Sequence, residues 1–302
     1  MPNIASIVNT KGPVMPRGID HLVLCVNDLK KARAQYEKLG FTMTPEAQHP
    51  FGTGNTLVQL KGGCFLEVLA VTKPEDITEA EGEHFSFAAF NRDYLTAREG
   101  MSMLVLDSTD EEADRAEFLD KGLHVHAPFD FQRLAKLPDG SEETVGFSLT
   151  FLSDARLPGM AFFTCKQWRP DLFWKDDYQR HANGAESIDE VFVVAPEPAD
   201  PARFLAAFAD TSEMETGTGF VKVRTSRGRL GVYTPDAFRE KFPHAYADNA
   251  FTAPFFAGFA VSAADPARMR SHWQDQGFHV RDSNGTAWLH PDDGFGCVIA
   301  AV

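Results

Sequence analysis

A histidine and a glutamate stand inside two of the most apolar runs of the chain. His21 lies in the run 18–28, and Glu67 lies in the run 64–71. An ionised carboxylate buried in a strand of this composition costs several kcal/mol unless a partner compensates its charge. A metal ion, an imidazole or an arginine could do so. The two residues are therefore candidates for a functional site, and the structural alternative is a buried His–Glu pair that satisfies itself.

A loop between these two runs, residues 49–55, carries His49 and Asn55 on either side of a Gly-Thr-Gly sequence. Its backbone N–H groups could bind an anionic substrate oxygen. The same glycines could instead serve only a turn that needs positive φ angles. Arg133 follows an apolar run, and could bind a substrate carboxylate through two hydrogen bonds or form a surface salt bridge. The sequence leaves both choices open.

Further candidates lie in the second half of the N-terminal region. Gln167 shares a strand face with Cys165 and could contact a ligand, whereas Cys165 is expected to pack, because no paired base is visible. His181 could fold back onto the N-terminal half or cap a connector. His124 and His126 alternate along one strand and could supply further ligands to a bound ion, although an edge strand that exposes polar residues to water is favoured. Apolar walls that exclude water are expected from Phe129, Phe147, Phe151 and Phe163.

The composition indicates large cores and an acidic surface. The 302 residues exceed one ordinary domain, and a hydrophobic content of 43% with 26 Phe can fill two cores. A net charge of −14 argues against nucleic acid or an anionic membrane as partner, because both require clustered positive charge. It does not exclude a small anionic substrate, which one local arginine could bind. We therefore expect a small-molecule substrate, and the chain could also form a homodimer.

Cysteine use and the N-terminus indicate the cellular compartment. The four cysteines lie far apart without a Cys-x-x-Cys pair, which favours buried, reduced thiols over a zinc ribbon. The N-terminus lacks the pattern of a signal peptide, and no run approaches the ~20 apolar residues that span a membrane. We therefore expect a cytoplasmic protein.

The elements that must position these side chains recur along the chain. A strand and a helix are predicted at 18–27 and 29–39, followed by strands at 41–43, 56–60 and 64–71. The same order is predicted at 100–166, with one strand at 124–131, and two further units begin near 188 and 256, the first of them with shorter later strands. In three units, 19 residues separate an aligned strand position from the glycine that closes the helix: His21–Gly40, Met103–Gly122 and Gly258–Gly277. The predicted helix caps are Asp28, Asp110 and Asp265.

Repetition at this level is typical of paired modules that share a curved sheet. It divides the chain into an N-terminal arm (1–17), a domain of two units (18–170), a connector (171–186) and a second domain of two units (187–302). The connector is rich in aromatic and charged residues, which indicates a packed segment. Each unit combines several strands with one helix, so the predicted fold class is α+β.

Four of these segments resemble one known family. They are Ile19-Asp-His-Leu-Val, Glu37-Lys-Leu-Gly-Phe41, the loop His49-Pro-Phe-Gly-Thr-Gly-Asn55, and Phe65-Leu-Glu-Val. Together they look like a glyoxalase-like domain of the vicinal oxygen chelate superfamily, which includes glyoxalase I, bleomycin-resistance proteins and extradiol dioxygenases. The resemblance covers residues 18 to about 185. It implies four βαβββ modules that form two cup-like domains.

In that superfamily a divalent metal binds ligands from the first and last strands of each module. The resemblance therefore implies that His21 and Glu67 could bind Zn, Mn, Fe, Ni or Co. The second module departs from the pattern, because Met103 and Phe162–Phe163 stand where two further ligands would lie. A metal would thus have at most two inherited protein ligands. In the C-terminal half the corresponding positions are predicted to be Glu190, Gly258 and Val298.

The implied function is an enzyme of lyase or isomerase type that acts on a small oxygenated, anionic metabolite in the N-terminal cup. Glu67 would transfer a proton, with His21 beside it, and Arg133 would hold the anion. Two alternatives stay open. One is a metal-free protein that binds or sequesters a small molecule, as bleomycin-resistance proteins do. The other is a ring-cleaving dioxygenase, which is disfavoured because its iron site needs a second histidine where Met103 stands.

Overall fold

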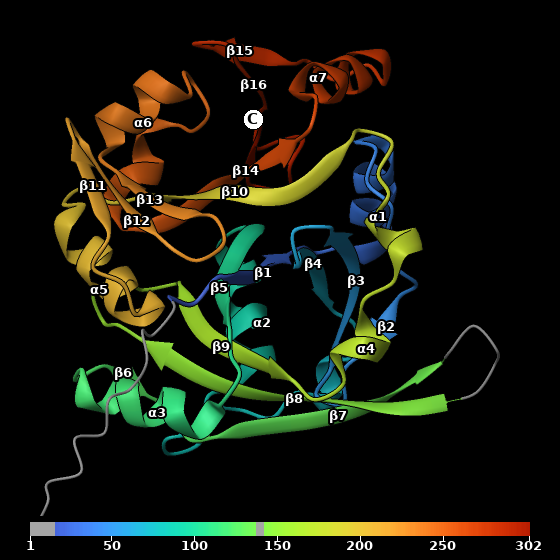
Figure 1. The fold of residues 1–302 in the computed structure, drawn as a ribbon, viewed down its shortest axis with the longest axis vertical. Coiled ribbons are helices and arrows are strands. Elements are labelled where there is room, and N and C mark those ends of the chain that lie inside the picture. The colour runs from blue at the N-terminus through green and yellow to red at the C-terminus, as the bar shows by residue number, and fades with distance from the viewer. Residues whose placement is uncertain (1–15, 137–141) are drawn as a thin grey trace, which may run out of the picture.

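The computed structural model describes residues 16–136 and 142–302. This part of the chain forms two mixed β-sheets that lie one above the other in Figure 1, each with helices packed against it. Strands β1 to β9 belong to the N-terminal domain, and β10 to β17 belong to the C-terminal domain. The predicted α+β class and the two sheet-based domains are confirmed.

The N-terminal sheet has the strand order β2-β3-β4-β1-β5-β9-β8-β6, and β7 pairs with β8. β1 is parallel to β4 and antiparallel to β5, so the first strands of the two modules lie side by side. The elements are β1 (Ile19–Cys25), α1 (Leu29–Lys38), β2 (Ala47–Gln48), β3 (Thr53–Leu60), β4 (Cys64–Val71), η1 (Pro74–Asp76), α2 (Phe87–Ala97), β5 (Gly100–Asp107), α3 (Glu111–Asp120), β6 (His124–Val125), β7 (Phe129–Lys136), β8 (Glu142–Ser153) and β9 (Ala161–Gln167).

The C-terminal sheet has the order β11-β12-β13-β10-β14-β17-β16-β15, with β10 parallel to β13 and antiparallel to β14. Two short helices, α4 (Pro170–Phe173) and η2 (Asp176–Gln179), connect the domains. The elements that follow are β10 (Ala185–Val194), α5 (Ala199–Ala209), β11 (Met214–Gly217), β12 (Phe220–Arg224), β13 (Arg229–Tyr233), α6 (Pro235–Lys241), η3 (Asp248–Thr252), β14 (Phe255–Ala263), α7 (Pro266–Asp275), β15 (Arg281–Ser283), β16 (Thr286–Leu289) and β17 (Val298–Ala301).

The predicted helix caps are confirmed in all three units. Asp28, Asp110 and Asp265 each accept a hydrogen bond from a backbone N–H in the first turn of the helix that follows. Such a bond satisfies one of the donors that a helix start leaves free. The glycines that close these helices have positive φ angles, as a left-handed helix end requires: Gly40, Gly122 and Gly277.

Both domains repeat the same irregularities in their central strand pair. The extra residue of the first strand is Asp20 in β1 and Asp189 in β10, and neither is paired across the ladder with the neighbouring strand. The partner strands carry the second irregularity, at Ser102 of β5 and Ala257 of β14. A β-bulge bends the strand and redirects side chains near it. The shared positions are direct structural support for the repeat, and the first bulge lies beside the candidate site.

Several predicted elements differ from the structure. Helices α2 and α6 were not predicted, and the strand predicted at 41–43 has no regular structure. The single strand predicted at 124–131 is two strands, β6 and β7. The loop predicted at 49–55 is partly strand, because β3 begins at Thr53. These errors concern short elements and element ends, where tertiary contacts outweigh local sequence preference.

One apolar core runs between the two domains. Phe162 of β9 packs against Phe204 of α5 and Phe256 of β14, with ring centroids 4.7 and 5.7 Å apart. At the edge of this core, the guanidinium of Arg227 lies 2.8 Å from the carboxylate of Asp107, which joins the two domains by an ion pair.

The predicted burial of the cysteines is confirmed, and all four are free. Among the described helices, none has the length and hydropathy needed to cross a membrane.

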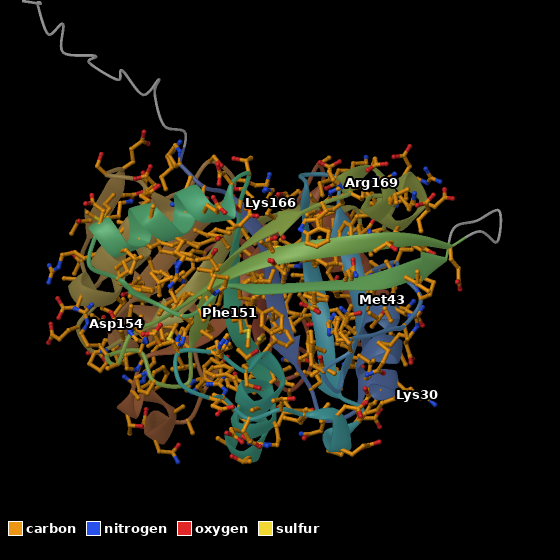
Figure 2. The ribbon with its side chains drawn as sticks, turned by 90° about the horizontal axis from the view of Figure 1, so that it is seen from below. Lys30, Met43, Phe151, Asp154, Lys166 and Arg169 are labelled. Atoms are coloured by element: carbon orange, nitrogen blue, oxygen red, sulfur yellow. The ribbon has the colours of Figure 1, made fainter. Side chains whose placement is uncertain are left out.

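A second apolar cluster fills the other side of the N-terminal sheet. Leu22 and Leu24 of β1 belong to the core between the domains, whereas Val23 and Cys25 belong to this second cluster, as the alternation of a strand requires. The cluster includes phenylalanines of the long β7–β8 hairpin, which runs across the molecule in Figure 2. This side of the sheet holds the candidate site.

The connector between the domains is packed against β3. The side chain of Gln59 donates to the carbonyl of Phe173 and accepts from the backbone N–H of Lys175, at 2.8 and 3.0 Å. The ring of His181 accepts from the backbone N–H of Thr42 and donates to the carbonyl of Gln59. These bonds hold Phe173 over one end of the second apolar cluster.

Candidate active site

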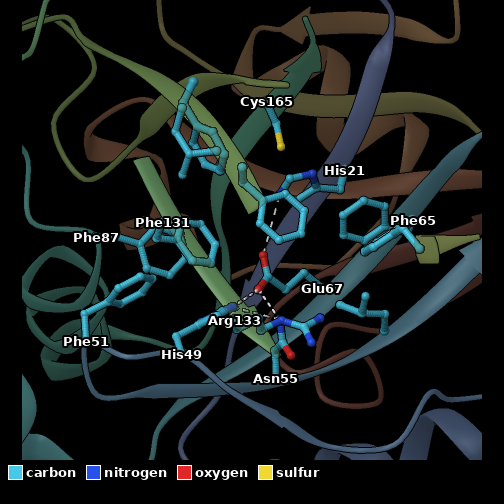
Figure 3. Close-up of a pocket in the computed structure, with 15 residues that line it drawn as sticks. His21, His49, Phe51, Asn55, Phe65, Glu67, Phe87, Phe131, Arg133 and Cys165 are labelled. Carbon is cyan, nitrogen blue, oxygen red and sulfur yellow. Dashed lines mark hydrogen bonds and ion pairs between the residues drawn. The ribbon is translucent and has the colours of Figure 1, made fainter. Parts of the chain in front are cut away.

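A small cavity of about 50 Å³ opens on the side of the N-terminal sheet that holds the second apolar cluster (Figure 3). Its polar and ionisable lining residues come from five strands and the loop before β3: His21, His49, Asn55, Glu67, Arg133 and Cys165. Its apolar walls are Phe51, Leu57, Phe65, Phe87, Phe131, Phe147, Leu149, Phe163 and Phe173. The cavity is therefore a narrow aromatic pocket with a few polar groups, which is the usual composition of a ligand site.

Glu67 stands at the centre of the polar groups. Its side chain is buried, and Oε1 accepts a hydrogen bond of 2.6 Å from the amide of Asn55. Oε2 lies 3.5 Å from Nε2 of His21, and Oε1 lies 3.8 Å from Nε2 of His49. The dashed lines in Figure 3 mark contacts of this group. Two imidazoles and an amide thus surround the carboxylate that the sequence predicted to need compensation.

His21 is held on three sides. Its Nδ1 lies 2.6 Å from Oδ1 of Asp20, which is the extra residue of the β1 bulge. Its ring stacks on Phe65, with centroids 4.2 Å apart, and meets the edge of Phe163. Because Nδ1 is engaged by a carboxylate, Nε2 is the nitrogen that faces Glu67. That contact is favourable only when a proton lies on one of the two groups, since two lone pairs would repel.

His49 is a buried, neutral imidazole. Its Nδ1 lies 2.8 Å from the hydroxyl of Thr53, and its Nε2 lies 3.3 Å from the amide nitrogen of Asn55. Since the amide can only donate, Nε2 accepts and Nδ1 carries the proton that Thr53 receives. The pKa of His49 is lowered to about 4, chiefly by burial; the Glu67 carboxylate opposes this shift, and the charges of Arg133 and His21 add to it. His49 therefore holds the Asn55 amide in place at neutral pH.

Arg133 contributes a cation to the cavity wall from strand β7. Burial lowers the pKa of its guanidinium, and the nearby Glu67 carboxylate raises it. Within residues 16–136 and 142–302, its guanidinium has neither a hydrogen bond nor a salt bridge within 4.0 Å. A half-buried guanidinium with unused N–H groups is suited to bind a carboxylate or another planar anion.

The donor groups of the pocket do not fit the metal site that the resemblance implies. Strand register places Met103 and Phe163 at the two ligand positions of the second module, as the spacing predicted. The amide of Asn55 directs an N–H group at Glu67, whereas a metal ion beside this carboxylate would need a lone pair there. The guanidinium of Arg133 adds a positive charge that would repel a cation. Among the described residues, no three His, Cys, Asp or Glu side chains are grouped as metal ligands would be. We therefore route no chemical step through a metal.

The structure brings together seven of the eleven residues predicted to form the site and its walls, and these seven line the cavity: His21, His49, Asn55, Glu67, Arg133, Phe147 and Phe163. Four others do not reach it. Phe129 packs behind the wall on Phe51, and Phe151 is fully buried against Phe163. Gln167 lies beyond the end of the lining, and His181 is engaged in the connector. Roles in substrate binding for these four stay predictions without geometric support.

Several lining residues were missed although strand alternation signals them. Phe65 lies two residues before Glu67 on β4, and Phe131 lies two residues before Arg133 on β7, so each shares a face with a predicted site residue. Phe87 and Phe173 had no such signal, because they come from α2 and α4, and only the tertiary fold brings these helices to the pocket.

The C-terminal domain has no counterpart of the His21–Glu67 pair, and a side chain fills the corresponding space. In the third module, strand register places Glu190 at the position of His21 and Gly231 at the position of Glu67. In the fourth module, Gly258 stands at the position of His21, as predicted, and Ala300, not Val298, stands at the position of Glu67. The hydroxyl of Tyr233 donates to the buried Glu190 carboxylate. A Cβ at Gly231 would lie 2.3 Å from Glu190 Oε1, so this carboxylate occupies the space of the missing side chain. The C-terminal domain is a degenerate copy.

Comparisons with known proteins agree with this architecture. The family described as a glyoxalase-like domain matches residues 19–209. No curated protein sequence matches the chain. Among solved structures, a hypothetical protein from Staphylococcus aureus is 13% identical with a TM-score of 0.67, and the match covers 95% of this chain and 99% of that one.

Two enzymes are also among the structural matches. A variant of 4-hydroxymandelate synthase from Streptomyces coelicolor is 12% identical with a TM-score of 0.58, covering 95% of this chain and 92% of that one. The Mn(II)-bound glyoxalase from Novosphingobium aromaticivorans is 9% identical with a TM-score of 0.50, covering 95% and 81%. At such identities these likenesses show the fold alone. Because the family match spans more than half of the chain, this protein belongs to the glyoxalase-like domain family of the vicinal oxygen chelate superfamily.

Proposed function

We propose that the N-terminal cavity is the active site of an acid–base enzyme, of isomerase or lyase type, for a small anionic carbonyl compound. The observation that carries this proposal is the Glu67 carboxylate, buried at the polar end of an aromatic cavity and held by Asn55 and His21. A carboxylate in such a place is suited to take a proton from carbon, since the dry surroundings strengthen every charge interaction in the reaction.

Arg133 supports an anionic substrate, and the walls support an apolar or aromatic group. The guanidinium can bind a carboxylate of the substrate through two hydrogen bonds. The phenylalanines around it offer edges and faces to a hydrocarbon or ring. The cavity of about 50 Å³ is smaller than the few hundred Å³ of typical ligand pockets, so the aromatic side chains must separate as the substrate enters.

The proposed chemistry is the transfer of a proton next to a carbonyl group. Glu67 takes the proton, so that the C–H bond breaks, an O–H bond forms on the carboxylate, and the electron pair moves onto the carbonyl oxygen. Return of the proton to another carbon gives an isomerase, and departure of a neighbouring group gives a lyase. Arg133 stabilises the negative charge of the substrate throughout. Cytoplasmic location and a homodimer stay predictions beside this proposal.

Proton exchange with solvent tests the proposal. The protein is incubated in D₂O with a set of small 2-oxo carboxylates that differ in their apolar part, and NMR measures deuterium at the carbon next to the carbonyl. We expect exchange above the buffer rate for at least one compound. Glu67→Gln should lower the rate by about 10²–10⁴-fold, whereas Arg133→Met should mainly raise KM. Glu190→Gln is the matched control in the C-terminal domain and should leave the rate unchanged.

The same experiment separates the alternatives. Binding of these compounds by calorimetry without any exchange would contradict the enzyme and support the metal-free binding protein. A ring-cleaving dioxygenase would instead consume oxygen with a catecholic substrate. That alternative is disfavoured because Met103 stands at the position of the second histidine, and its side chain is fully buried.

A further inference from the structure

Asp20 and His21 are neighbours in sequence, yet their side chains meet. Successive residues of a regular strand point to opposite faces of the sheet. The bulge in β1 breaks this rule, because Ile19 and His21 pair with the consecutive residues Leu106 and Val105, and Asp20 is the extra residue between them. The carboxylate of Asp20 thereby reaches Nδ1 of His21, at 2.6 Å.

The pair is almost completely buried. Asp20 is 5% exposed and His21 is 4% exposed, and Asp20 does not line the cavity. A carboxylate in such a position costs free energy unless a hydrogen bond satisfies it. The bond to Nδ1 does so, and at 2.6 Å it is at the short end of the range for charge-assisted bonds. Asp20 therefore determines which nitrogen of His21 carries the fixed proton.

The C-terminal domain provides an internal comparison. The same bulge recurs there, with Asp189 as the extra residue before Glu190. Asp189 pairs with Arg229 at the surface of the sheet, and no imidazole follows it. The bulge and its aspartate are thus shared by both domains, whereas the contact of an aspartate with an imidazole beside a cavity occurs at Asp20. This difference separates a role in the site from a role in the fold.

We propose that Asp20 is a positioning residue of the acid–base site, which keeps the Nδ1 proton of His21 in place and presents Nε2 to Glu67 and the cavity. The proposal rests on the proposed function. The order Asp20–His21–Glu67 follows from the two contacts of the ring, 2.6 Å at Nδ1 and 3.5 Å at Nε2. The stacking of the ring on Phe65 prevents a flip that would exchange the two nitrogens.

This arrangement gives Nε2 a defined step in the reaction. The step starts with a proton on each nitrogen of the His21 ring. As Glu67 takes the proton from carbon, the electron pair moves to the carbonyl oxygen of the substrate, and that oxygen receives the proton of Nε2. The C–H and N–H bonds break, and two O–H bonds form, one on Glu67 and one on the substrate. His21 is left neutral with its proton on Nδ1, where Asp20 accepts it. Returning the two protons reverses each bond change and restores the site.

Histidine NMR and kinetics together test the proposal. Protein labelled with ¹⁵N-histidine is compared as wild type, Asp20→Asn and the matched control Asp189→Asn, and His21→Gln assigns the signal. In the wild type we expect a far-downfield proton bound to Nδ1 of His21 that exchanges slowly with water. It should be lost in Asp20→Asn and kept in Asp189→Asn.

For a compound that exchanges, Asp20→Asn should lower kcat by about 10²–10⁴-fold with little change in KM, as tautomer loss does in a catalytic triad.

Each outcome decides a separate question. A wild-type His21 without a proton on Nδ1 overturns the proposal, and this holds even if Asp20→Asn fails to fold. An Asp20→Asn protein as active as Asp189→Asn also overturns it. If no compound exchanges in the wild type, the proposed function fails, while the Nδ1 signal and its loss in Asp20→Asn still support the positioning of His21.

Discussion

The amide nitrogen of Asn55 lies 2.6 Å from Oε1 of Glu67, and both side chains are buried. The same amide lies 3.3 Å from Nε2 of His49. One amide thus links a neutral imidazole to a carboxylate and leaves Oε2 of Glu67 directed toward His21. The segment 49–55, which ends on β3, therefore acts on the site through the side chain of Asn55, which contacts the carboxylate.

Replacing Asn55 by Leu should destabilise the protein. The change keeps the number and branching of the side-chain heavy atoms but leaves Glu67 without its strongest donor, and an unsatisfied buried acceptor costs about 1–3 kcal/mol. The free energy of unfolding in guanidinium chloride measures this loss. Asn249→Leu, at an exposed position, is the control and should have little effect. Equal stability of the two variants would show that the hydrogen bond to Glu67 contributes nothing.

His49 should make the stability depend on pH. Burial lowers its pKa from 6.5 to about 4 in the folded protein, so between these pH values the unfolded chain binds more protons. Stability is then fully present above pH 6.5 and falls as the pH drops toward 4, by about 3 kcal/mol at most. Denaturant unfolding at several pH values should show this slope in the wild type and a smaller one in His49→Gln. His84→Gln, at an exposed histidine, should keep the wild-type slope.

Chelation should leave the protein intact. Of the four ligand positions that the family resemblance implies, two hold His21 and Glu67, and the other two hold Met103 and Phe163. These positions therefore provide two donors and no complete site. Dialysis against EDTA should therefore change neither the unfolding temperature nor ligand binding, and Mn²⁺ or Zn²⁺ should not raise the unfolding temperature. A rise that is lost in His21→Gln would contradict this prediction and restore the metal implied by the resemblance.

Tyr233→Phe should weaken the C-terminal domain without affecting the cavity. The change removes the hydroxyl that donates to Glu190, so the buried carboxylate keeps only the more distant cations of Lys222 and Arg229, at 3.7 and 3.8 Å. We expect a loss of about 1–3 kcal/mol in the free energy of unfolding. Exchange activity per folded molecule should stay at the wild-type level. A loss of activity at full stability would indicate that the C-terminal domain takes part in the reaction.

Local patterns in the sequence were sufficient for the architecture. The caps Asp28, Asp110 and Asp265 and their closing glycines predicted the repeat, because caps depend on a few neighbouring residues. The helices α2 and α6 escaped prediction, because they lie between the repeating units and follow no shared spacing.

For the site, the sequence by itself determined that His21 and Glu67 each need a partner, because buried polar groups in apolar strands must be satisfied. Only the tertiary structure decided what those partners are. Asn55 and Asp20 supply the hydrogen bonds, through the pairing of β3 with β4 and through a bulge in β1 that redirects one side chain. Phe87 and Phe173 close the pocket from distant helices. Such contacts depend on how elements pack and on strand register, and neither is encoded in the spacing of residues within one segment.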